Sequence, residues 1–442
     1  MKKRLSVVKG TRDHLPAAAI QREKMLDSLR TVFRRYGFDP LETPALENWE
    51  TLSGKYGEDA ERLIYRFTDR GGRDIGLRYD LTVPLARVVA SNPQLPKPFK
   101  RYQIQPVWRA DKPQRGRFRE FLQCDWDIVG SSSPAADAET IAVLHDCLDA
   151  LDIGPFVVRI SERGVIQAML EAAGVPPTAR NVLEVARAVD KLDKIGAEGV
   201  REELTKRGVE RAAADHILTI LERRSLRLEE GFGDAKGLFR DAPSADAAFE
   251  RLGTLGDRLR DLALPEERLV FDLSLARGLD YYTGPVFEAV MTDAGVGSVA
   301  GGGRYDGLIG TFSGSATPAV GASIGLDRIS AALQEREADD APSTHVQVLV
   351  TVVDAALLGE AARLAARLRG RGLNTELYLG AADLRGQLGY ARQKGVRFVA
   401  FLGPDEIAKG HVQIKDMKTR KQEGGEEERQ VAMIRALLEE QT

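Results

Sequence analysis

The residues from position 277 to 287 combine side chains that could bind a small zwitterion next to a phosphate. Arg277 opens this segment, and Asp280, Tyr281 and Tyr282 follow it closely. A core strand does not normally place an arginine and an aspartate beside paired aromatic rings. A pocket that holds a charged amino acid against a phosphate needs all of these groups. The segment therefore indicates a polar binding site.

Arginines that could bind phosphate gather between positions 102 and 130. A strand is expected at 102–109, where Arg109 ends it, and Arg117 lies in the polar loop that follows. Guanidinium groups hold phosphate oxygens in a two-pronged fork, which suits a bent nucleoside triphosphate. The two arginines are therefore candidate ligands of such a molecule.

The next expected strand, at 119–129, separates a polar face from an apolar one. Gln123, Asp125 and Asp127 alternate with core-type residues, so the three polar side chains share one face. Acceptors aligned in this way can bind an ammonium group or an imidazole N–H. The same pattern fits the exposed face of an ordinary antiparallel hairpin. The residues alone leave both interpretations open.

Three further motifs are less specific. Asp80 and Thr82 would share one strand face, but they also fit a turn that caps the following helix. The glycines of 301–306 could admit a ligand close to the backbone, although a plain tight turn is the commoner use of such a run. In 321–328, small residues lead into a helix with Arg328 in its first turn, where a cation is unfavourable unless an anion lies there.

The elements that must position these residues change in kind along the chain. A helix is expected at 17–36, where apolar residues recur at helical spacing. Strands are expected at 156–160, 268–275 and 286–291. Between the first two, residues 164–264 are rich in Ala, Leu, Glu and Arg and predict a helical insertion.

The end of the chain has the pattern of a separate domain. Residues 336–344 are charged, polar and interrupted by proline, which predicts a linker. Strands and helices then alternate regularly, so residues 345–442 are expected to form an α/β domain with a mostly parallel sheet.

Composition excludes several classes of protein. The 442 residues include 66 acidic and 63 basic ones, so the chain lacks the bulk charge of a small non-specific nucleic-acid binder. Its two cysteines cannot build a disulfide framework, which fits a reducing cytoplasm. None of the five histidines has metal-ligand spacing, so no protein metal site is predicted. Neither a signal peptide nor an apolar run of membrane length is expected.

In their order along the chain, these segments resemble the class II aminoacyl-tRNA synthetases, and in finer detail the histidyl-tRNA synthetase family. The finer resemblance rests on residues 9–13, 78–82, 123–127, 277–282 and 301–306. It implies an α+β catalytic domain over residues 1–335, built on an antiparallel sheet with flanking helices and a helical insertion at about 164–264. It also implies that residues 345–442 bind an anticodon.

The resemblance implies a two-step reaction. L-Histidine and ATP, the latter with Mg²⁺, would give histidyl-adenylate, and the histidyl group would pass to the 3′ end of tRNA-His. The resemblance further implies a cytoplasmic homodimer with no membrane association.

Site residues follow from the same resemblance. Those implied to bind histidine are Asp80, Thr82, Gln123, Asp127, Arg277, Tyr281, Tyr282 and Tyr305. Asp127 and Tyr282 would contact the two imidazole nitrogens, which rejects substrates lacking that donor–acceptor pair. Those implied to bind ATP are Arg109, Arg117 and Arg328, and the catalytic residues would be Arg109 and Arg277.

The chain departs from the family pattern at two positions. Asp111 and Asp327 stand where glutamate is usual, which keeps the charge on a shorter side chain. The loop 111–117, which is expected to approach the tRNA acceptor end, also differs from the form in many bacterial members.

Two alternatives to an active enzyme follow from the resemblance. One is a catalytically inactive paralogue that senses histidine as a regulatory subunit of ATP phosphoribosyltransferase. That paralogue lacks the C-terminal domain and the motif at 277–282, and this chain has both. The other is a tRNA-binding module of the kind fused to stress kinases, but the sequence contains no kinase signature. An active enzyme is the favoured interpretation.

Overall fold

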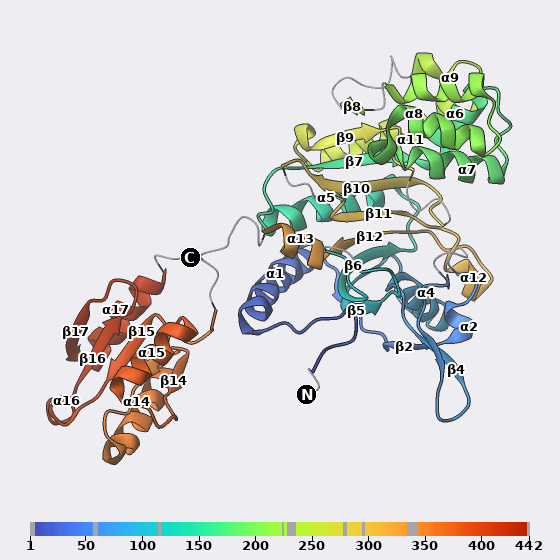
Figure 1. Cartoon of the computed structure of the whole chain (residues 1–442). Coiled ribbons are helices and arrows are strands. Elements are labelled where there is room, and N and C mark those ends of the chain that lie inside the picture. The colour runs from blue at the N-terminus through green and yellow to red at the C-terminus, as the bar shows by residue number, and fades with distance from the viewer. Residues whose placement is uncertain are drawn as a thin grey trace. The chain divides into compact units, whose positions relative to one another are not determined.

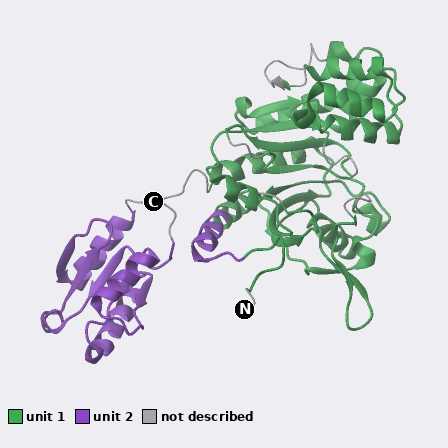
Figure 2. Ribbon diagram, viewed as in Figure 1, with its two compact units in different colours: residues 1–12, 26–336 green, residues 13–25, 337–442 purple. Residues whose placement is uncertain are grey.

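The computed structural model of the protein describes two compact units. The described residues are 5–55, 61–113, 116–222, 225–227, 236–276, 281–293, 297–333 and 343–439. The first unit combines residues 1–12 with 26–336, and the second combines residues 13–25 with 337–442 (Figure 2). Within the described residues, no helix is both long and apolar enough to cross a membrane.

A nine-stranded sheet forms the centre of the first unit (Figure 1). In spatial order its strands are β1 (Asp39–Pro40), β5 (Phe99–Trp108), β6 (Glu120–Val129), β12 (Ala319–Gly325), β11 (Ala300–Arg304), β10 (Pro285–Met291), β7 (Phe156–Glu162), β9 (Leu269–Asp272) and β8 (Ser225–Arg227). Only the pairs β1–β5 and β7–β9 are parallel. The mainly antiparallel sheet with flanking helices confirms the predicted fold class.

One face of this sheet is covered by α1 (Pro16–Arg35) and α5 (Pro134–Ala150). Phe33 of α1 stacks on Tyr102 with ring centroids 5.1 Å apart and lies 5.5 Å from the Trp126 ring. Trp126 also donates a hydrogen bond of 3.2 Å from Nε1 to the carbonyl of Thr140 on α5. The apolar face predicted for β6 is therefore the core face, and its polar face points to the opposite side of the sheet.

Helices dominate the segment between β7 and β9. They are α6 (Arg163–Ala172), α7 (Ala179–Val189), α8 (Leu192–Lys206), α9 (Arg211–Glu222), η2 (Gly237–Phe239), α11 (Pro243–Asp261) and η3 (Glu266–Arg268). The α11 helix packs against α5 and β7, which ties the helical segment to the central sheet. One piece departs from the expected helical character, because β8 pairs with the edge strand β9. Three residues are too few to show a strand period in the sequence.

The glycine run at 301–303 lies inside a strand and not in a tight turn. It occupies β11 between β10 and β12. A β-carbon on Gly302 would overlap the carbonyl oxygen of Gly321, and one on Gly303 would lie 2.9 Å from the Tyr282 ring. The turn interpretation is therefore wrong, because these glycines make room within the sheet and beneath a tyrosine ring.

A small sheet and short helices complete the first unit. They are β2 (Leu46–Asn48), α2 (Trp49–Leu52), β3 (Arg66–Thr68), β4 (Asp74–Leu77), α4 (Thr82–Ser91), α12 (Gly310–Ser313) and α13 (Leu326–Leu333). A turn at residues 70–73 joins β3 to β4, and Gly72 adopts φ +78° there.

The C-terminal part is an α/β fold. Its sheet order is β14 (Thr375–Leu377), β13 (Val348–Val350), β15 (Phe398–Phe401), β16 (His411–Asp416) and β17 (Gln422–Glu426), and the first three strands are parallel. Its helices are η4 (Ala355–Leu357), α14 (Leu358–Gly370), α15 (Leu384–Lys394), α16 (Pro404–Lys409) and α17 (Glu427–Glu439). On β13, Val348 and Val350 pack with α14 and α17, whereas Leu349 packs with α15. Helices thus cover both faces. Residues 336–342 of the predicted linker at 336–344 lie outside the described residues.

Candidate active site

Two adjoining cavities open on the polar face of β6. The first has a volume of about 560 Å³ and the second of about 440 Å³. Arg109, Gln123 and Ser323 line both cavities, so the two cavities adjoin at these residues. The pair could hold two small molecules, or two parts of one molecule, in contact.

The predicted site residues divide between the two cavities. Those that line the first are Asp80, Thr82, Arg109, Gln123, Asp127, Tyr281, Tyr282 and Tyr305. Those that line the second are Arg109, Arg117 and Arg328, together with Gln123. Arg277 and Asp280 lie outside the described residues.

The floor of the first cavity contains a buried ion pair. Asp127 of β6 faces Arg101 of β5 in the antiparallel register, and Nη2 of Arg101 lies 2.7 Å from Oδ2 of Asp127. Tyr305 donates its hydroxyl to Oδ1 of the same carboxylate. Burial raises the pKa of Asp127, while Arg101 and the Tyr305 hydroxyl act in the opposite direction. Arg101 was missed by sequence reasoning, because nothing in the sequence indicates which residue of β5 faces Asp127.

A second buried carboxylate lies two residues away. Asp125 lines the first cavity and is only 3% exposed. Burial raises its pKa to about 7 despite the opposing effects of Arg101 and a hydrogen bond from Ser323. Ser323 lies opposite Asp125 on β12, and its Oγ accepts a 3.0 Å hydrogen bond from Nε2 of Gln123. The period-two pattern placed Asp125 on the correct face but left it outside the predicted site.

Three tyrosines form the aromatic wall of the first cavity. The ring centroids of Tyr281 and Tyr282 are 4.3 Å apart, and those of Tyr281 and Tyr305 are 6.3 Å apart. Burial raises the pKa of Tyr282 to about 12. Its phenol therefore stays neutral near pH 7 and can either donate or accept a hydrogen bond.

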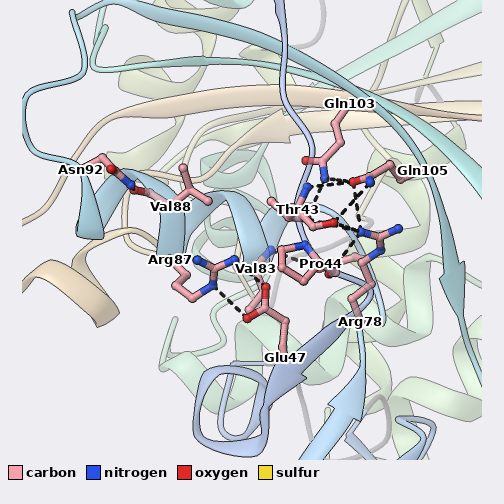
Figure 3. Close-up of polar contacts among 11 residues, drawn as sticks. Thr43, Pro44, Glu47, Arg78, Val83, Arg87, Val88, Asn92, Gln103 and Gln105 are labelled. Atoms are coloured by element: carbon pink, nitrogen blue, oxygen red, sulfur yellow. Dashed lines mark hydrogen bonds and ion pairs between the residues drawn. The ribbon is translucent and has the colours of Figure 1, made fainter.

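A buried arginine fixes the segment that presents Asp80. Arg78 is 2% exposed and donates from Nη1 to the carbonyl of Thr43 at 2.6 Å and to Oε1 of Gln105 at 3.0 Å (Figure 3). Two residues on, Oδ1 of Asp80 accepts a 3.1 Å hydrogen bond from the backbone N–H of Val83 in α4. The capping interpretation is therefore confirmed, whereas the shared strand face is wrong, because α4 begins at Thr82. Asp80 and Thr82 nevertheless both line the first cavity.

Arginine side chains give the second cavity its positive charge. The Arg109 guanidinium stacks over the rings of Tyr79 and Phe121, at 4.3 and 5.1 Å from their centroids. Its Nε donates to the carbonyl of Tyr79 at 3.1 Å. Arg328, in the first turn of α13, donates from Nη1 to the carbonyl of Ser298 at 2.6 Å. Aromatic stacking and backbone acceptors hold these guanidinium groups at the cavity wall, where they suit an anionic ligand.

The resemblance becomes decisive when the chain is compared with known proteins. A family model described as histidyl-tRNA synthetase matches residues 10–329. The chain belongs to the histidyl-tRNA synthetase family. A second family model, described as an anticodon binding domain, matches residues 347–437.

Individual members of the histidyl-tRNA synthetase family match over nearly their whole length. A histidine–tRNA ligase of Aeropyrum pernix is 47% identical over 406 residues, which is 91% of each chain. The crystal structure of histidyl-tRNA synthetase from a Nostoc species is 30% identical, with a TM-score of 0.87 over 98% of this chain and 100% of its own. A Bacillus halodurans structure described as an ATP phosphoribosyltransferase regulatory subunit/histidyl-tRNA synthetase is 26% identical, with a TM-score of 0.73 over 88% of this chain and 97% of its own.

Asp327, one of the two aspartates that depart from the family pattern, has structural partners. Asp327 forms an ion pair with Arg12 and accepts a 3.2 Å hydrogen bond at Oδ2 from the backbone N–H of Leu122. The Arg12 guanidinium also lies 3.8 Å from the centroid of the Phe118 ring. This aspartate thus joins the N-terminal segment, the start of β6 and α13 beside the second cavity. Sequence reasoning missed Arg12 in this role, because 315 positions separate it from Asp327.

Proposed function

We propose that this protein is a histidine–tRNA ligase that activates L-histidine with ATP and transfers it to the 3′ end of tRNA-His. The observation that supports the proposal most is that the two cavities adjoin and share lining residues. An acidic, tyrosine-lined cavity suits an amino acid, and the adjoining arginine-lined cavity suits a triphosphate. Arg109 borders both, so it can reach the atoms that must react.

In the first step, a carboxylate oxygen of histidine attacks the α-phosphorus of ATP. The new oxygen–phosphorus bond forms as the bond from the α-phosphorus to the bridging oxygen breaks, and pyrophosphate leaves. Arg109 stabilises the negative charge on the α-phosphate oxygens, and the family resemblance assigns Arg277 to the substrate carboxylate and that phosphate. Arg117 and Arg328 bind the outer phosphates. Fixed cations at developing charge are an effective source of catalysis.

Selection of histidine takes place in the first cavity. Asp80, Thr82 and Gln123 hold the α-ammonium group, while Asp127 and Tyr282 contact the imidazole nitrogens. The Asp127 carboxylate, whose ionised form Arg101 favours, accepts an N–H, and the neutral Tyr282 hydroxyl bonds the other nitrogen. A substrate without this pair of nitrogens would leave buried polar groups unpaired, which is strongly unfavourable.

Mg²⁺ would arrive with ATP and take phosphate oxygens and water as ligands. Within the described residues, no cluster of three or more His, Cys, Asp or Glu side chains could hold a metal ion. Among the described residues, the carboxylates that line the second cavity are Asp111 and Asp327. Bound Mg²⁺ would offset negative charge on the phosphates during the transfer.

In the second step, a ribose hydroxyl of the terminal adenosine attacks the carbonyl carbon of the adenylate, and AMP leaves. The catalytic domain at 1–335 performs both steps. The domain at 345–442 binds the anticodon, and the loop 111–117 approaches the acceptor end. The insertion at about 164–264 belongs to the catalytic domain. The active species is a homodimer in the cytoplasm.

Exchange of radiolabelled pyrophosphate into ATP tests the proposal directly. We expect exchange only when L-histidine is present, followed by charging of tRNA-His but not of other tRNAs. Binding of histidine without exchange would instead favour the histidine-sensing regulatory subunit. The match of residues 347–437 to an anticodon binding domain supports the ligase over that alternative.

A further inference from the structure

Two buried oxygen atoms on β6 line the first cavity without a donor. They are Oε1 of Gln123 and Oδ1 of Asp125, on side chains of residues that are 8% and 3% exposed. The two residues are neighbours on the same strand face, at a spacing of two. Burying an acceptor without a partner is unfavourable by roughly 1–3 kcal/mol. Both atoms therefore indicate a ligand that brings its own donors.

The surroundings of Asp125 differ from those of Asp127. The Asp127 carboxylate has an ion pair with Arg101 and a hydrogen bond from Tyr305. Asp125 has a hydrogen bond from Ser323. Arg101 also lowers the pKa of Asp125 by its charge, but it forms its ion pair with Asp127. The remaining charged groups that act on Asp125 are Asp80 and Asp127, both of the same sign. Among the described residues, Arg101 is the cation that acts on Asp125, and its ion pair is with Asp127.

Ser323 links the two acceptors. Its Oγ accepts from Nε2 of Gln123 at 3.0 Å, so its own hydroxyl hydrogen is free to bond Asp125. This arrangement uses the amide N–H of Gln123 and one oxygen of Asp125. It leaves Oε1 of Gln123 and Oδ1 of Asp125 as the remaining acceptors, both on side chains that line the first cavity.

We propose that Asp125 is a further substrate-binding residue that accepts a hydrogen bond from the α-ammonium group of the amino acid. The proposal rests on the proposed function and deepens it, since Gln123 already has the α-ammonium group as its partner there. An ammonium group offers three N–H donors and one positive charge, which matches two unpaired oxygens and one buried carboxylate. A neutral imidazole N–H would satisfy an oxygen but leave the buried charge of Asp125 in place.

L-Histidine and two analogues that each lack one of its groups provide the test. L-Histidine and histamine have the ammonium group, whereas 3-(imidazol-4-yl)propionate has the imidazole and carboxylate without it. Calorimetric Kd values at pH 8 are compared for the wild type, Asp125→Asn and the smaller replacement Asp125→Ala. We expect about 10–100-fold weaker binding of histidine and histamine by both variants. Binding of the propionate should change less than threefold, roughly the size of a minor packing effect.

A matched control separates binding from folding. Asp137→Asn also removes a buried carboxylate, one that pairs with Arg304 at 2.9 Å and lines neither cavity. It should leave the ratio of histidine to propionate affinity unchanged. Equal losses for all three ligands in the Asp125 variants would assign Asp125 to structure and overturn the inference. Failure of the wild type to bind histidine would instead overturn the proposed function itself.

Discussion

Arg101 and Asp127 face each other across neighbouring antiparallel strands and form a fully buried ion pair beneath the first cavity. Such a pair contributes little net stability, because both charges lose their hydration. Arg101 lowers the pKa of Asp127, which burial raises, and so favours the ionised carboxylate. In the proposed function, Asp127 must be ionised to accept an imidazole N–H.

Replacement of Arg101 by methionine should therefore weaken histidine binding and also lower the stability of the protein. We expect the free energy of unfolding to fall by about 3–5 kcal/mol, because Asp127 is left buried without its counter-charge. The double variant Arg101→Met/Asp127→Asn should regain most of that stability but not histidine binding. Urea titration and calorimetry measure the two effects.

The control is Arg87→Met, which removes the ion pair between Arg87 and Glu47, whose charged atoms are 2.7 Å apart (Figure 3). Neither residue lines either cavity. The control variant should leave the Kd for histidine within about twofold of the wild-type value, since distant sites act independently. If the double variant is no more stable than Arg101→Met, the uncompensated charge is not the cause of the loss.

Arg109→Lys keeps a positive charge where the two cavities adjoin but replaces the planar guanidinium group by an ammonium group. A fork that binds two oxygens of the α-phosphate should not be replaceable by an ammonium group. We expect kcat of the pyrophosphate exchange to fall by about 10²–10³-fold, typical for loss of one transition-state donor. The KM for ATP should rise less than tenfold, about 1.4 kcal/mol of ground-state binding. A change in KM alone would mean that Arg109 binds ATP without acting on the transition state.

Gly321→Ala tests how closely the sheet is fitted around Asp127. A β-carbon at Gly321 would overlap Oδ1 of Asp127, which faces it in the register of β6 and β12. The carboxylate must then move, and we expect loss of histidine binding by at least about tenfold, or 1.4 kcal/mol. Gly307→Ala is the matched control, because a β-carbon there meets no atom within 4 Å. Wild-type affinity in both variants would contradict the described position of Asp127.

The raised pKa of Asp125 predicts how stability depends on pH. Its pKa is about 7 in the folded, ligand-free protein and about 4 in an unfolded chain. A carboxyl group whose pKa is raised by folding contributes stability at pH values below its pKa in the unfolded chain. That contribution is lost as the pH rises through the folded pKa of about 7. Asp125→Asn removes this loss. Between pH 5 and pH 8, the free energy of unfolding of the variant should therefore rise relative to that of the wild type by roughly 2–4 kcal/mol.

Urea titrations of the ligand-free proteins at several pH values measure that gain. Asp127 and Asp137 also have raised pKa values, so the stability of the Asp125→Asn variant should fall with rising pH as well. The difference between the two proteins isolates Asp125. A difference that stays constant from pH 5 to pH 8 would show that Asp125 does not titrate in this range.

Local pattern was enough to predict the strands that form the floor of the site. The alternation of β6 separates Cys124 and Trp126, which are fully buried in the core, from Gln123 and Asp127 in the first cavity. A strand has only two faces, so a period of two decides both at once. The order of motifs then predicted which residues gather around the two cavities.

Contacts between distant segments were not predictable in this way. The register that pairs Arg101 with Asp127 depends on how two strands align, and a strand sequence does not state its own alignment. The Arg12–Asp327 ion pair joins opposite ends of the catalytic unit. The glycines of β11 have no side chains to show a period, so only the fold shows that Gly302 lies against Gly321.

Arg109, Gln123 and Ser323 line both cavities, and this has a thermodynamic consequence. Whatever occupies one cavity orders side chains that the other occupant also touches. The two occupants must then influence each other's affinity, and linkage requires the same factor in both directions. Titrating histidine at saturating ATP analogue, and the analogue at saturating histidine, should return one coupling free energy. The shared side chains thus make the two substrates mutual effectors.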